Sequence, residues 1–318
     1  MTEMATSNAI GDTPSSTLRR FEGNPILTAE AFPFPANSAF NPAAVEYDGT
    51  TLLLVRLEDR RGLSLLHVAR SPNGFTDWKV DPSPAFRPIP GDHSAEWGFE
   101  DPRAVWVPEL SQYVITCTAY GPGGPAVHLS LTDDFNTFEH YGVVIAPDDK
   151  NAALFPRRIG GTWAMLHRPM TTSHTTADIW ISRSNDLLSW RTPEHVMACR
   201  TGAWWDSARI GTGPPPIETD EGWLLIYHGV KQMVGGPIYR VGLALLDIDE
   251  PNKVLRRCND WIFGPEADYE RSGDVNNVVF PCGAIVDPNG NVRVYYGSAD
   301  TTVSVATTSV HELLTALG

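Results

Sequence analysis

Two adjacent carboxylates in the segment GFEDPRAVW at 98–106 are the sharpest chemical feature of the sequence. When two carboxylates stand side by side, repulsion between their charges favours retention of one proton. A protonated carboxyl group is what a general acid requires, so Glu100 and Asp101 are candidates for that role. A structural interpretation is equally open, in which Asp-Pro opens a β-strand and Arg103 neutralises the charge.

A second set of residues could bind an anion. Its members are basic, titratable or phenolic side chains at corresponding points of separate apolar segments: Lys150, Arg168, Arg209, His228 and Tyr239. Burying a cation is costly unless an anion answers it, and guanidinium groups suit phosphate and carboxylate groups. The set predicts a local positive pocket for an inorganic or organic anion. Salt bridges that tie the fold together are the alternative interpretation.

The elements that must position these residues form a repeat. An apolar strand, a polar turn and an aromatic residue recur, with strands that begin near residues 63, 125, 176, 239 and 301. Two further apolar segments precede each copy, and turn signals such as Asp48-Gly49 and Asn289-Gly290 separate them. Five units of about 60 residues, each with three or four antiparallel strands, predict an all-β, five-bladed β-propeller. A β-sandwich with coincidental spacing is the alternative.

The repeat predicts where the polar residues meet. Adjacent antiparallel strands bring the start of one strand beside the end of its neighbour. Residues at the starts of the first strands, such as Asn41 and Asp101, should therefore meet those at the ends of the second strands, such as Arg56 and Asp300, at one mouth of the central channel. Aromatic residues in or near this mouth could stack on sugar rings: Trp97, Tyr120, Trp204, Trp205, Tyr239 and Tyr296.

Composition excludes several classes of protein. Twenty-four basic and 38 acidic side chains give a net charge of −14, which repels phosphodiester backbones, so no nucleic-acid partner is expected. No window approaches 18 apolar residues, so no membrane span is expected either. Four scattered cysteines and nine histidines show no metal-ligand spacing. The first twenty residues lack the apolar core of a signal peptide, which favours a cytoplasmic protein. We expect residues 1–20 to be a flexible segment and residues 21–318 to form one catalytic propeller domain.

A resemblance to a known family rests on motifs that occur in order along the chain. NPAAV, GFEDPR, KNAALFP, MLHRP, WWDSARIGTGPPPI, LIYHGV, YRVGLALLD and VYYGSAD resemble glycoside hydrolase family 130, the β-mannoside phosphorylases and related β-1,2-mannosidases. The resemblance runs from about Arg20 to the end of the sequence and implies a five-bladed propeller. It implies that Asp101 is the catalytic acid and that the anion set holds phosphate. It also implies that Asn41, Arg56 and Asp300 bind mannose. Arg103 is a further candidate for substrate binding, and His174 is a candidate contact to the acceptor sugar.

The chemistry agrees with phosphorolysis. An inverting glycosidase needs a carboxylate base that activates water, whereas phosphate arrives as an anion and needs cations to hold it. In related hydrolases glutamates replace members of the basic set, and here the cations are retained. We therefore expect Asp101 to protonate the glycosidic oxygen, directly or through a mannose hydroxyl. Inorganic phosphate, as co-substrate and with no cofactor, would attack the anomeric carbon to give α-mannose 1-phosphate.

Three other functions stay open. The first is a phosphate-independent β-mannosidase, with a base among four glutamates: Glu58, Glu96, Glu266 and Glu270. The second is a non-catalytic sugar-binding propeller. The third is a propeller glycosidase of the arabinanase or fructosidase type, which would use two or three carboxylates. The linkage (β-1,4 or β-1,2), the acceptor sugar and the formation of a homo-oligomer are also open.

Overall fold

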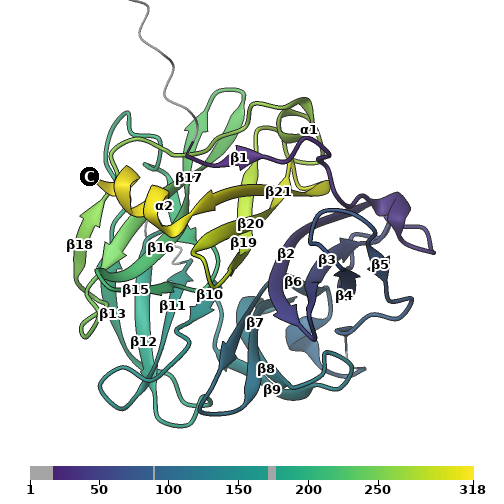
Figure 1. Ribbon diagram of the computed structural model, residues 1–318. Helices are drawn as coiled ribbons and strands as arrows, with labels where there is room; N and C mark the ends of the chain where they lie inside the picture. Colours follow the sequence, from purple (N-terminus) through teal and green to yellow (C-terminus); the bar gives the residue numbers. More distant parts are fainter. Residues whose placement is uncertain (1–16, 89, 171–176) are drawn as a thin grey trace, which may run out of the picture.

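The chain folds as a five-bladed β-propeller, which confirms the predicted fold class (Figure 1). A computed structural model describes residues 17–88, 90–170 and 177–318. The first blade contains β2 (Ser38–Tyr47), β3 (Thr50–Glu58), β4 (Ser64–Ser71) and β5 (Lys79–Val80), and the second contains β6 (Gly98–Val107), β7 (Gln112–Gly121), β8 (Gly124–Thr132) and β9 (Glu139–Ile145). One parallel bridge, Ser64 to Gly98, joins these two blades into a single hydrogen-bonded sheet.

The other three blades repeat this antiparallel pattern. The third contains β10 (Asp149–Leu154), β11 (Trp163–Pro169), β12 (Ile179–Ser184) and β13 (Arg191–Met197), and the fourth contains β14 (Arg209–Thr212), β15 (Ile217–Thr219), β16 (Gly222–Met233), β17 (Gly236–Leu246) and β18 (Val254–Arg257). The fifth contains β19 (Val279–Val286), β20 (Asn291–Ser298), β21 (Thr302–Ser309) and β1 (Arg19–Arg20). The helices are short: α1 (Asp268–Arg271), α2 (Val310–Leu317) and two 3-10 turns, Ala29–Ala31 and His93–Ala95.

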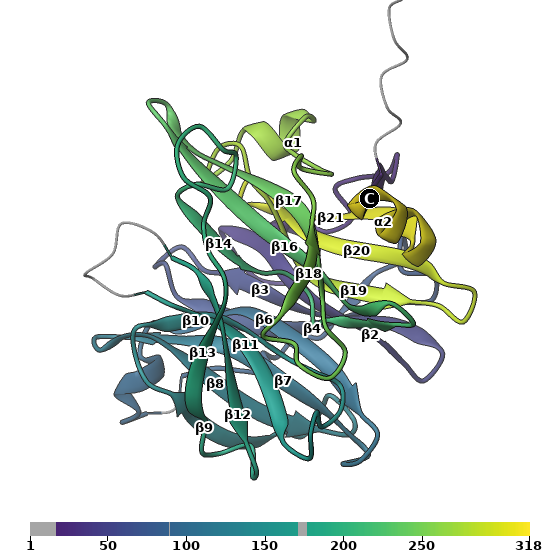
Figure 2. The same cartoon turned by 90° about the vertical axis from the view of Figure 1, so that its left-hand side faces the viewer.

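The blades form a ring because their apolar faces pack against one another. Strands of neighbouring blades are in contact around the ring, and β19 of the last blade contacts β2 of the first, so these two blades lie side by side (Figures 1 and 2). The buried apolar clusters follow the same rule. One cluster combines residues of the first two blades, one combines the second and third, and one combines the first and fifth. Burial between blades therefore holds the channel-lining strands in place.

A left-handed residue interrupts the first strand of each of the first three blades. Asn41, Asp101 and Asn151 have φ angles of 46°, 48° and 56°, and at each one the pairing with the second strand shifts its register. Asn277, just before β19, has a φ of 60°. Asn and Asp tolerate this conformation better than other residues with a side chain, and a bulge re-aims the side chain. The Asn or Asp at this point of the repeat is thus placed for the same conformational reason in four of the five blades.

The ring is closed by a strand from the beginning of the chain. Arg19 and Arg20 pair with Thr307 and Ala306 of β21, and Leu18 is buried. The predicted boundary at residue 20 therefore lies too late, since residues 18–20 belong to the fifth blade. Residues 1–16 lie outside the described residues.

A buried ion pair fixes this closing strand. Glu270, with a fully buried side chain, accepts hydrogen bonds from Nε and NH2 of Arg20, each at 2.8 Å, and from the hydroxyl of Tyr296 at 2.8 Å. Arg20 also donates to the carbonyl of Gly264 at 2.6 Å. The neighbouring Arg19 pairs instead with Glu312, where both side chains are largely exposed. Two adjacent arginines thus make a buried and an exposed ion pair.

We expect Arg20→Gln to destabilise the protein by about 3 kcal/mol, because it leaves the Glu270 carboxylate buried without its cation. Arg19→Gln is the matched control and should cost less than about 1 kcal/mol, as exposed pairs do. Chemical denaturation of the two variants and the wild type measures both differences. Equal losses in the two variants would show that the buried pair does not secure the strand.

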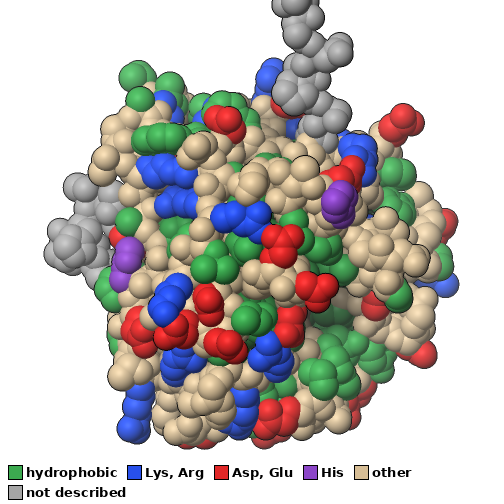
Figure 3. Space-filling view, turned by 60° about the vertical axis from the view of Figure 1, so that its left-hand side comes forward, with side chains coloured by type: hydrophobic (Ala, Val, Ile, Leu, Met, Phe, Trp, Pro, Cys, Tyr) green, Lys and Arg blue, Asp and Glu red, His purple; other side chains and the backbone are tan. Residues whose placement is uncertain are grey.

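Two further features concern membrane-spanning helices and surface charge. None of the helices in the described part of the chain has the length and apolar character needed to cross a membrane. On the face shown in Figure 3, acidic and basic side chains are interspersed and do not form one basic field. That mixture agrees with the net charge of −14.

Candidate active site

The predicted site residues come from all five blades. The first strands supply Asn41, Asp101, Lys150 and Arg209, and the second strands or the residues after them supply Arg56, Arg168, His228 and Asp300. Tyr239 lies on β17 and Arg103 follows Asp101 on β6. Contacts and electrostatic interactions connect these residues into one group, as described below. His174 lies outside the described residues.

Asp101 is held by two donors from the first blade. Its Oδ1 accepts hydrogen bonds from Nδ2 of Asn41 at 2.8 Å and from NH1 of Arg56 at 3.0 Å, and the residue is only 7% exposed. Arg56 also bonds Glu100 at 3.0 Å and Oγ of Ser64 at 3.0 Å. The guanidinium of Arg56 therefore contacts both neighbouring carboxylates.

This geometry changes the expected protonation. Burial by itself raises the pKa of Asp101, but the charges of Arg56 and Arg103 outweigh it and leave that pKa below its usual value. Asp101 is thus ionised at neutral pH in this structure. The lowered pKa argues against the interpretation that Asp101 retains a proton beside Glu100, because Arg56 offsets the repulsion on which that interpretation depended.

Among the carboxyl groups on the acidic side of the site, Asp300 has a raised pKa. Burial, helped by repulsion from Asp101, raises the pKa of Asp300 to about 7. The nearby charge of Arg56 opposes this shift without cancelling it. Asp300 can therefore donate a hydrogen bond as a neutral carboxyl group near neutral pH.

The raised pKa of Asp300 makes stability depend on pH. The folded protein holds a proton that the unfolded chain loses near pH 4, so the wild type loses stability as the pH rises from about 4 to 7. Asp300→Asn removes this group, and Asn tolerates the residue's φ of 49°. We expect the melting temperature of Asp300→Asn relative to wild type to increase between pH 5 and pH 8. A constant difference across that range would contradict the assigned protonation.

The basic half of the site lies in the third and fourth blades. Arg168 is buried, its NH1 lies 3.1 Å from Nε2 of His228, and its Nε has no hydrogen-bond partner among the residues that the structure describes. Asn151, with its amide oxygen toward the guanidinium, accepts from Arg168 at 2.9 Å. Burial, together with repulsion from Arg209 and Arg103, lowers the pKa of Arg168 to about 10 against the opposing effect of Tyr239.

Other cations surround Arg168, whereas its neighbour His228 is neutral. Burial and the charge of Arg168 hold the pKa of His228 far below its usual value, so its ring is neutral and accepts from the guanidinium. Burial also lowers the pKa of Lys150, although Glu100 acts in the opposite direction. Arg209 lies 6.0 Å from the ring centre of Tyr239, which is nearly parallel to the His228 ring. A buried donor without a partner among mutually repelling cations is the arrangement that an anion would stabilise.

Arg103 has a different role from the one predicted. It is 1% exposed, and its guanidinium donates to the carbonyls of Asp101, Thr212 and Gly213 at 2.7, 2.9 and 3.0 Å. The last two belong to the fourth blade, so Arg103 spans the channel and fixes the peptide of Asp101. The structure thus makes Arg103 a positioning residue where a sugar contact was expected.

A cavity of about 370 Å³ opens beside both halves of the site, lined by Glu100, Tyr120, Pro125, Asp148, Lys150 and Met170. Tyr120 packs edge-on against the exposed Trp97, with ring centres 5.1 Å apart, as expected of aromatics at the mouth. Trp205 and Tyr296 are buried, and Trp204 lines a separate cavity on the fourth blade, so these three residues do not meet that expectation. Sequence reasoning gave Asn151 no role, although its repeat position matches Asn41 and Asp101.

The four glutamates proposed as a base for hydrolysis differ in position. Glu270 is buried and fully engaged with Arg20 and Tyr296. Glu266 and Glu96 are exposed and pair with Arg20 and His93. Glu58 alone among the four adjoins the site, where it lies 3.5 Å from Arg56 and burial raises its pKa. No group of three His, Cys, Asp or Glu side chains within the described ranges is placed to hold a metal ion.

Comparison with known proteins gives a consistent result. A family model described as β-1,4-mannooligosaccharide phosphorylase matches residues 16–318. A β-1,4-mannooligosaccharide phosphorylase from Ruminococcus albus is 38% identical over 93% of this chain and 89% of its own length. The structure of a β-1,2-mannobiose phosphorylase from Listeria innocua, in complex with β-1,2-mannobiose, aligns with a TM-score of 0.87 and 31% identity, over 94% of this chain and 99% of that one.

Hydrolases also occur among the structural neighbours. One structure, 25% identical with a TM-score of 0.82, covers 96% of this chain and 97% of its own. Its description states that the family of mannoside phosphorylases contains glycoside hydrolases that target β-1,2-mannosidic linkages. Relatedness alone therefore does not distinguish phosphorolysis from hydrolysis. The charge of the site is the feature that can distinguish them.

Proposed function

Since the chain belongs to glycoside hydrolase family 130, and its matched relatives are β-mannoside phosphorylases, we propose that it phosphorolyses a β-linked manno-oligosaccharide with inversion. The products are α-mannose 1-phosphate and an acceptor shortened by one mannose. We favour a β-1,4 linkage, because the matched family description and the 38% identical relative both name it. Relatives named for β-1,2-linked substrates are 32–34% identical.

The observation that carries the proposal is the buried Arg168, whose Nε has no partner among the described residues and which is surrounded by other cations. We assign phosphate to Lys150, Arg168, Arg209, His228 and Tyr239. A phosphate anion there would satisfy the donor and relieve the repulsion among the cations. A water molecule could accept from the donor, but it carries no charge and would not relieve the repulsion.

In the proposed reaction, mannose lies between the two halves of the site. Asn41, Arg56 and the protonated Asp300 hold its hydroxyl groups. A phosphate oxygen attacks the anomeric carbon from the side of Arg168, and the bond from that carbon to the glycosidic oxygen breaks. The protonated fraction of Asp101, which bound phosphate increases as described below, supplies the proton that the departing oxygen takes up, directly or through a mannose hydroxyl. No carboxylate base is required, because the nucleophile is already an anion.

Phosphate also has an electrostatic effect on the acid. The charges of Arg56, Arg103 and Lys150 lower the pKa of Asp101. Bound phosphate brings negative charge next to the same cations and raises that pKa toward its ordinary value. Loading of the nucleophile thus promotes protonation of the acid, which couples the two reactants.

The proposal is tested by incubating the enzyme with β-1,4-mannobiose in buffers with and without phosphate. We expect stoichiometric mannose 1-phosphate in the first and background turnover in the second. Release of free mannose at the same rate in both would establish a hydrolase. Glu58 is then the base to test, because it adjoins the acidic half of the site, and Glu58→Gln should abolish that hydrolysis.

A further inference from the structure

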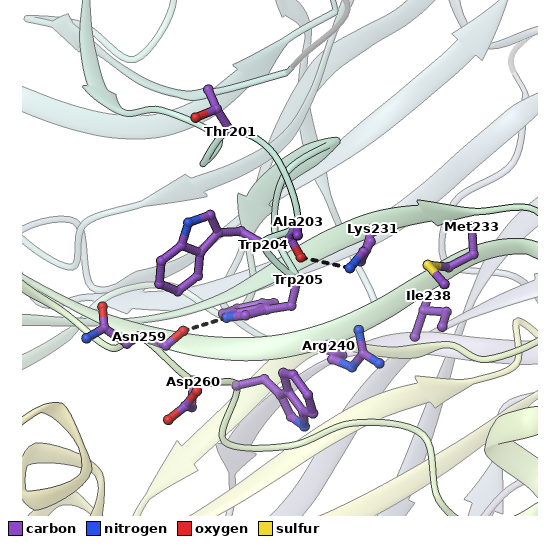
Figure 4. A pocket seen from close by; sticks show the side chains of 11 residues that line it. Thr201, Ala203, Trp204, Trp205, Lys231, Met233, Ile238, Arg240, Asn259 and Asp260 are labelled. Atoms are coloured by element: carbon purple, nitrogen blue, oxygen red, sulfur yellow. Dashed lines mark hydrogen bonds between the residues drawn. The ribbon is translucent and has the colours of Figure 1, made fainter.

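A second cavity lies on the fourth blade, away from the proposed reaction centre. It has a volume of about 430 Å³, and we call it the Trp pocket. Its lining residues are Thr201, Ala203, Trp204, Trp205, Lys231, Met233, Ile238, Arg240, Asn259, Asp260 and Trp261. Figure 4 shows Trp204 and Trp205 on the segment before β14, facing the β16–β17 hairpin.

The hairpin separates the Trp pocket from the phosphate-binding residues. Lys231 pairs with Ile238, and Val230 pairs with Tyr239, in an unbroken antiparallel register. Because side chains alternate between the two faces of a sheet, Lys231, Ile238 and Arg240 lie on one face, and His228 and Tyr239 lie on the other. The Trp pocket is therefore a separate site and not an extension of the catalytic cavity.

Two glycines form the floor of the Trp pocket. A Cβ atom on Gly229 or Gly242 would lie 2.4 or 2.5 Å from the ring of Trp205. The absence of side chains lets this indole lie against the hairpin, where it stacks with Tyr227 at 5.6 Å. Its Nε1 donates to the carbonyl of Asn259 at 2.8 Å (Figure 4). The floor is thus rigid and apolar.

The walls of the Trp pocket are two exposed indoles. Trp204 is 42% exposed and Trp261 is 47% exposed. The guanidinium of Arg200 lies 4.5 Å from the ring centre of Trp204, and that of Arg240 lies 4.2 Å from that of Trp261. Each ring is held by a cation over one face and leaves the rest of its surface to the solvent.

Polar groups stand beside these rings. Asp260, Asn259 and Thr201 are exposed lining residues with hydrogen-bonding side chains. The two lining cations are already engaged, since Nζ of Lys231 donates to the carbonyl of Ala203 at 2.7 Å and the guanidinium of Arg240 lies over the ring of Trp261. A neutral ring with hydroxyl groups on its edge and C–H groups on its faces fits this combination. A phosphate group would meet Asp260, and an aliphatic chain would bury the polar groups without partners.

We propose that the Trp pocket is a second saccharide-binding site, which holds a pyranose unit of a neutral β-1,4-manno-oligosaccharide. The C–H face of the sugar stacks on Trp261 and Trp204, and Asp260 and Thr201 bind its hydroxyl groups. The inference of a sugar site rests on the aromatic geometry alone. The choice of a mannoside as its ligand rests on the proposed function. Binding there raises the concentration of chains near the catalytic cavity without contributing to bond cleavage.

Affinity electrophoresis tests this site. Wild type is run in phosphate-free native gels with and without a soluble β-1,4-mannan, beside Trp261→Ala and Trp204→Ala. We expect the mannan to retard the wild type and each variant to lose most of that retardation. The affinity should fall roughly tenfold, as expected for loss of one stacking ring. The kcat/KM for mannobiose in phosphate should stay within about twofold of wild type, since the disaccharide fits the catalytic cavity alone.

Trp106→Ala is the matched control, because Trp106 is 43% exposed and lies on the second blade. It should be retarded like the wild type. The proposal would be overturned if mannan retarded neither the wild type nor Trp106→Ala, or if the variants of the Trp pocket migrated like Trp106→Ala. So would a lower mass of Trp261→Ala in light scattering, which would make the Trp pocket an interface between copies of the chain. Failure of phosphorolysis with intact, Trp261-dependent retardation would overturn only the proposed function.

Discussion

Asp101→Asn is expected to reduce phosphorolysis of mannobiose by roughly 10³-fold, because an amide cannot supply the proton that the departing oxygen needs. The fold should be unaffected. Asp101 has a φ of 48°, and the equivalent bulges of the first and third blades already carry Asn41 and Asn151. The amide oxygen can still accept from Asn41 and Arg56. Steady-state kinetics and a melting curve measure both expectations.

An activated substrate separates acid catalysis from binding in this variant. An aryl β-mannoside whose phenolate leaves without a proton should lose far less activity than mannobiose. Removal of one negative charge near Lys150 should also leave the KM for phosphate unchanged or lower. If both substrates lost activity equally, Asp101 would not be the proton donor.

Arg168→Gln is expected to raise the KM for phosphate roughly 100-fold, with a much smaller change in the KM for mannobiose. The variant removes the charge and the free Nε donor on which phosphate binding is proposed to depend, a loss that typically corresponds to about 2–5 kcal/mol. The KM for mannose 1-phosphate in the synthetic direction should rise in parallel. Initial rates at varied phosphate and fixed mannobiose measure the effect.

Stability distinguishes a binding arginine from a structural one in this second variant. Arg168 is repelled by Arg209 and Arg103, so its removal should leave the melting temperature unchanged or higher. Arg183→Gln, on β12 of the same blade, is the matched control and should leave the KM for phosphate unchanged. A large drop in melting temperature of Arg168→Gln, with an unaltered KM for phosphate, would assign Arg168 to the fold.

Periodicity is what made the fold predictable. The predicted third-strand starts near 63, 125, 239 and 301 lie within a few residues of β4, β8, β17 and β21. Recurrence of Asn and Asp at one point of the repeat indicated residues that meet at the mouth of the channel. The bulges that these residues form are a finding of the structure, explained by the few residue types that adopt their φ angles. Lys150, Arg168 and His228 could be grouped for the same reason, since equivalent positions in different blades face one channel.

The properties that sequence reasoning missed depend on contacts between distant segments. Neighbours in sequence suggested that Glu100 and Asp101 share a proton. In the structure the charge of Arg56, from another blade, lowers the pKa of Asp101, and burial raises the pKa of Asp300. Arg103 was expected to contact a sugar, but two of its three carbonyl partners lie about 110 residues away. Trp205 was expected at the mouth, but two glycines of the β16–β17 hairpin accommodate it on the other face.

Closure of the ring by β1 has a consequence for how the protein is made. The two-residue strand Arg19–Arg20 leaves the ribosome early, yet its partner Thr307 is synthesised almost 300 residues later. Until then the last blade presents an open edge, which invites association between nascent chains. Because so short a strand makes few backbone hydrogen bonds, the side chain of Arg20 supplies much of the contact that holds β1 in the fifth blade. Slow translation of the final blade, or loss of that arginine, should therefore reduce the yield of correctly assembled rings before it affects the activity of those that form.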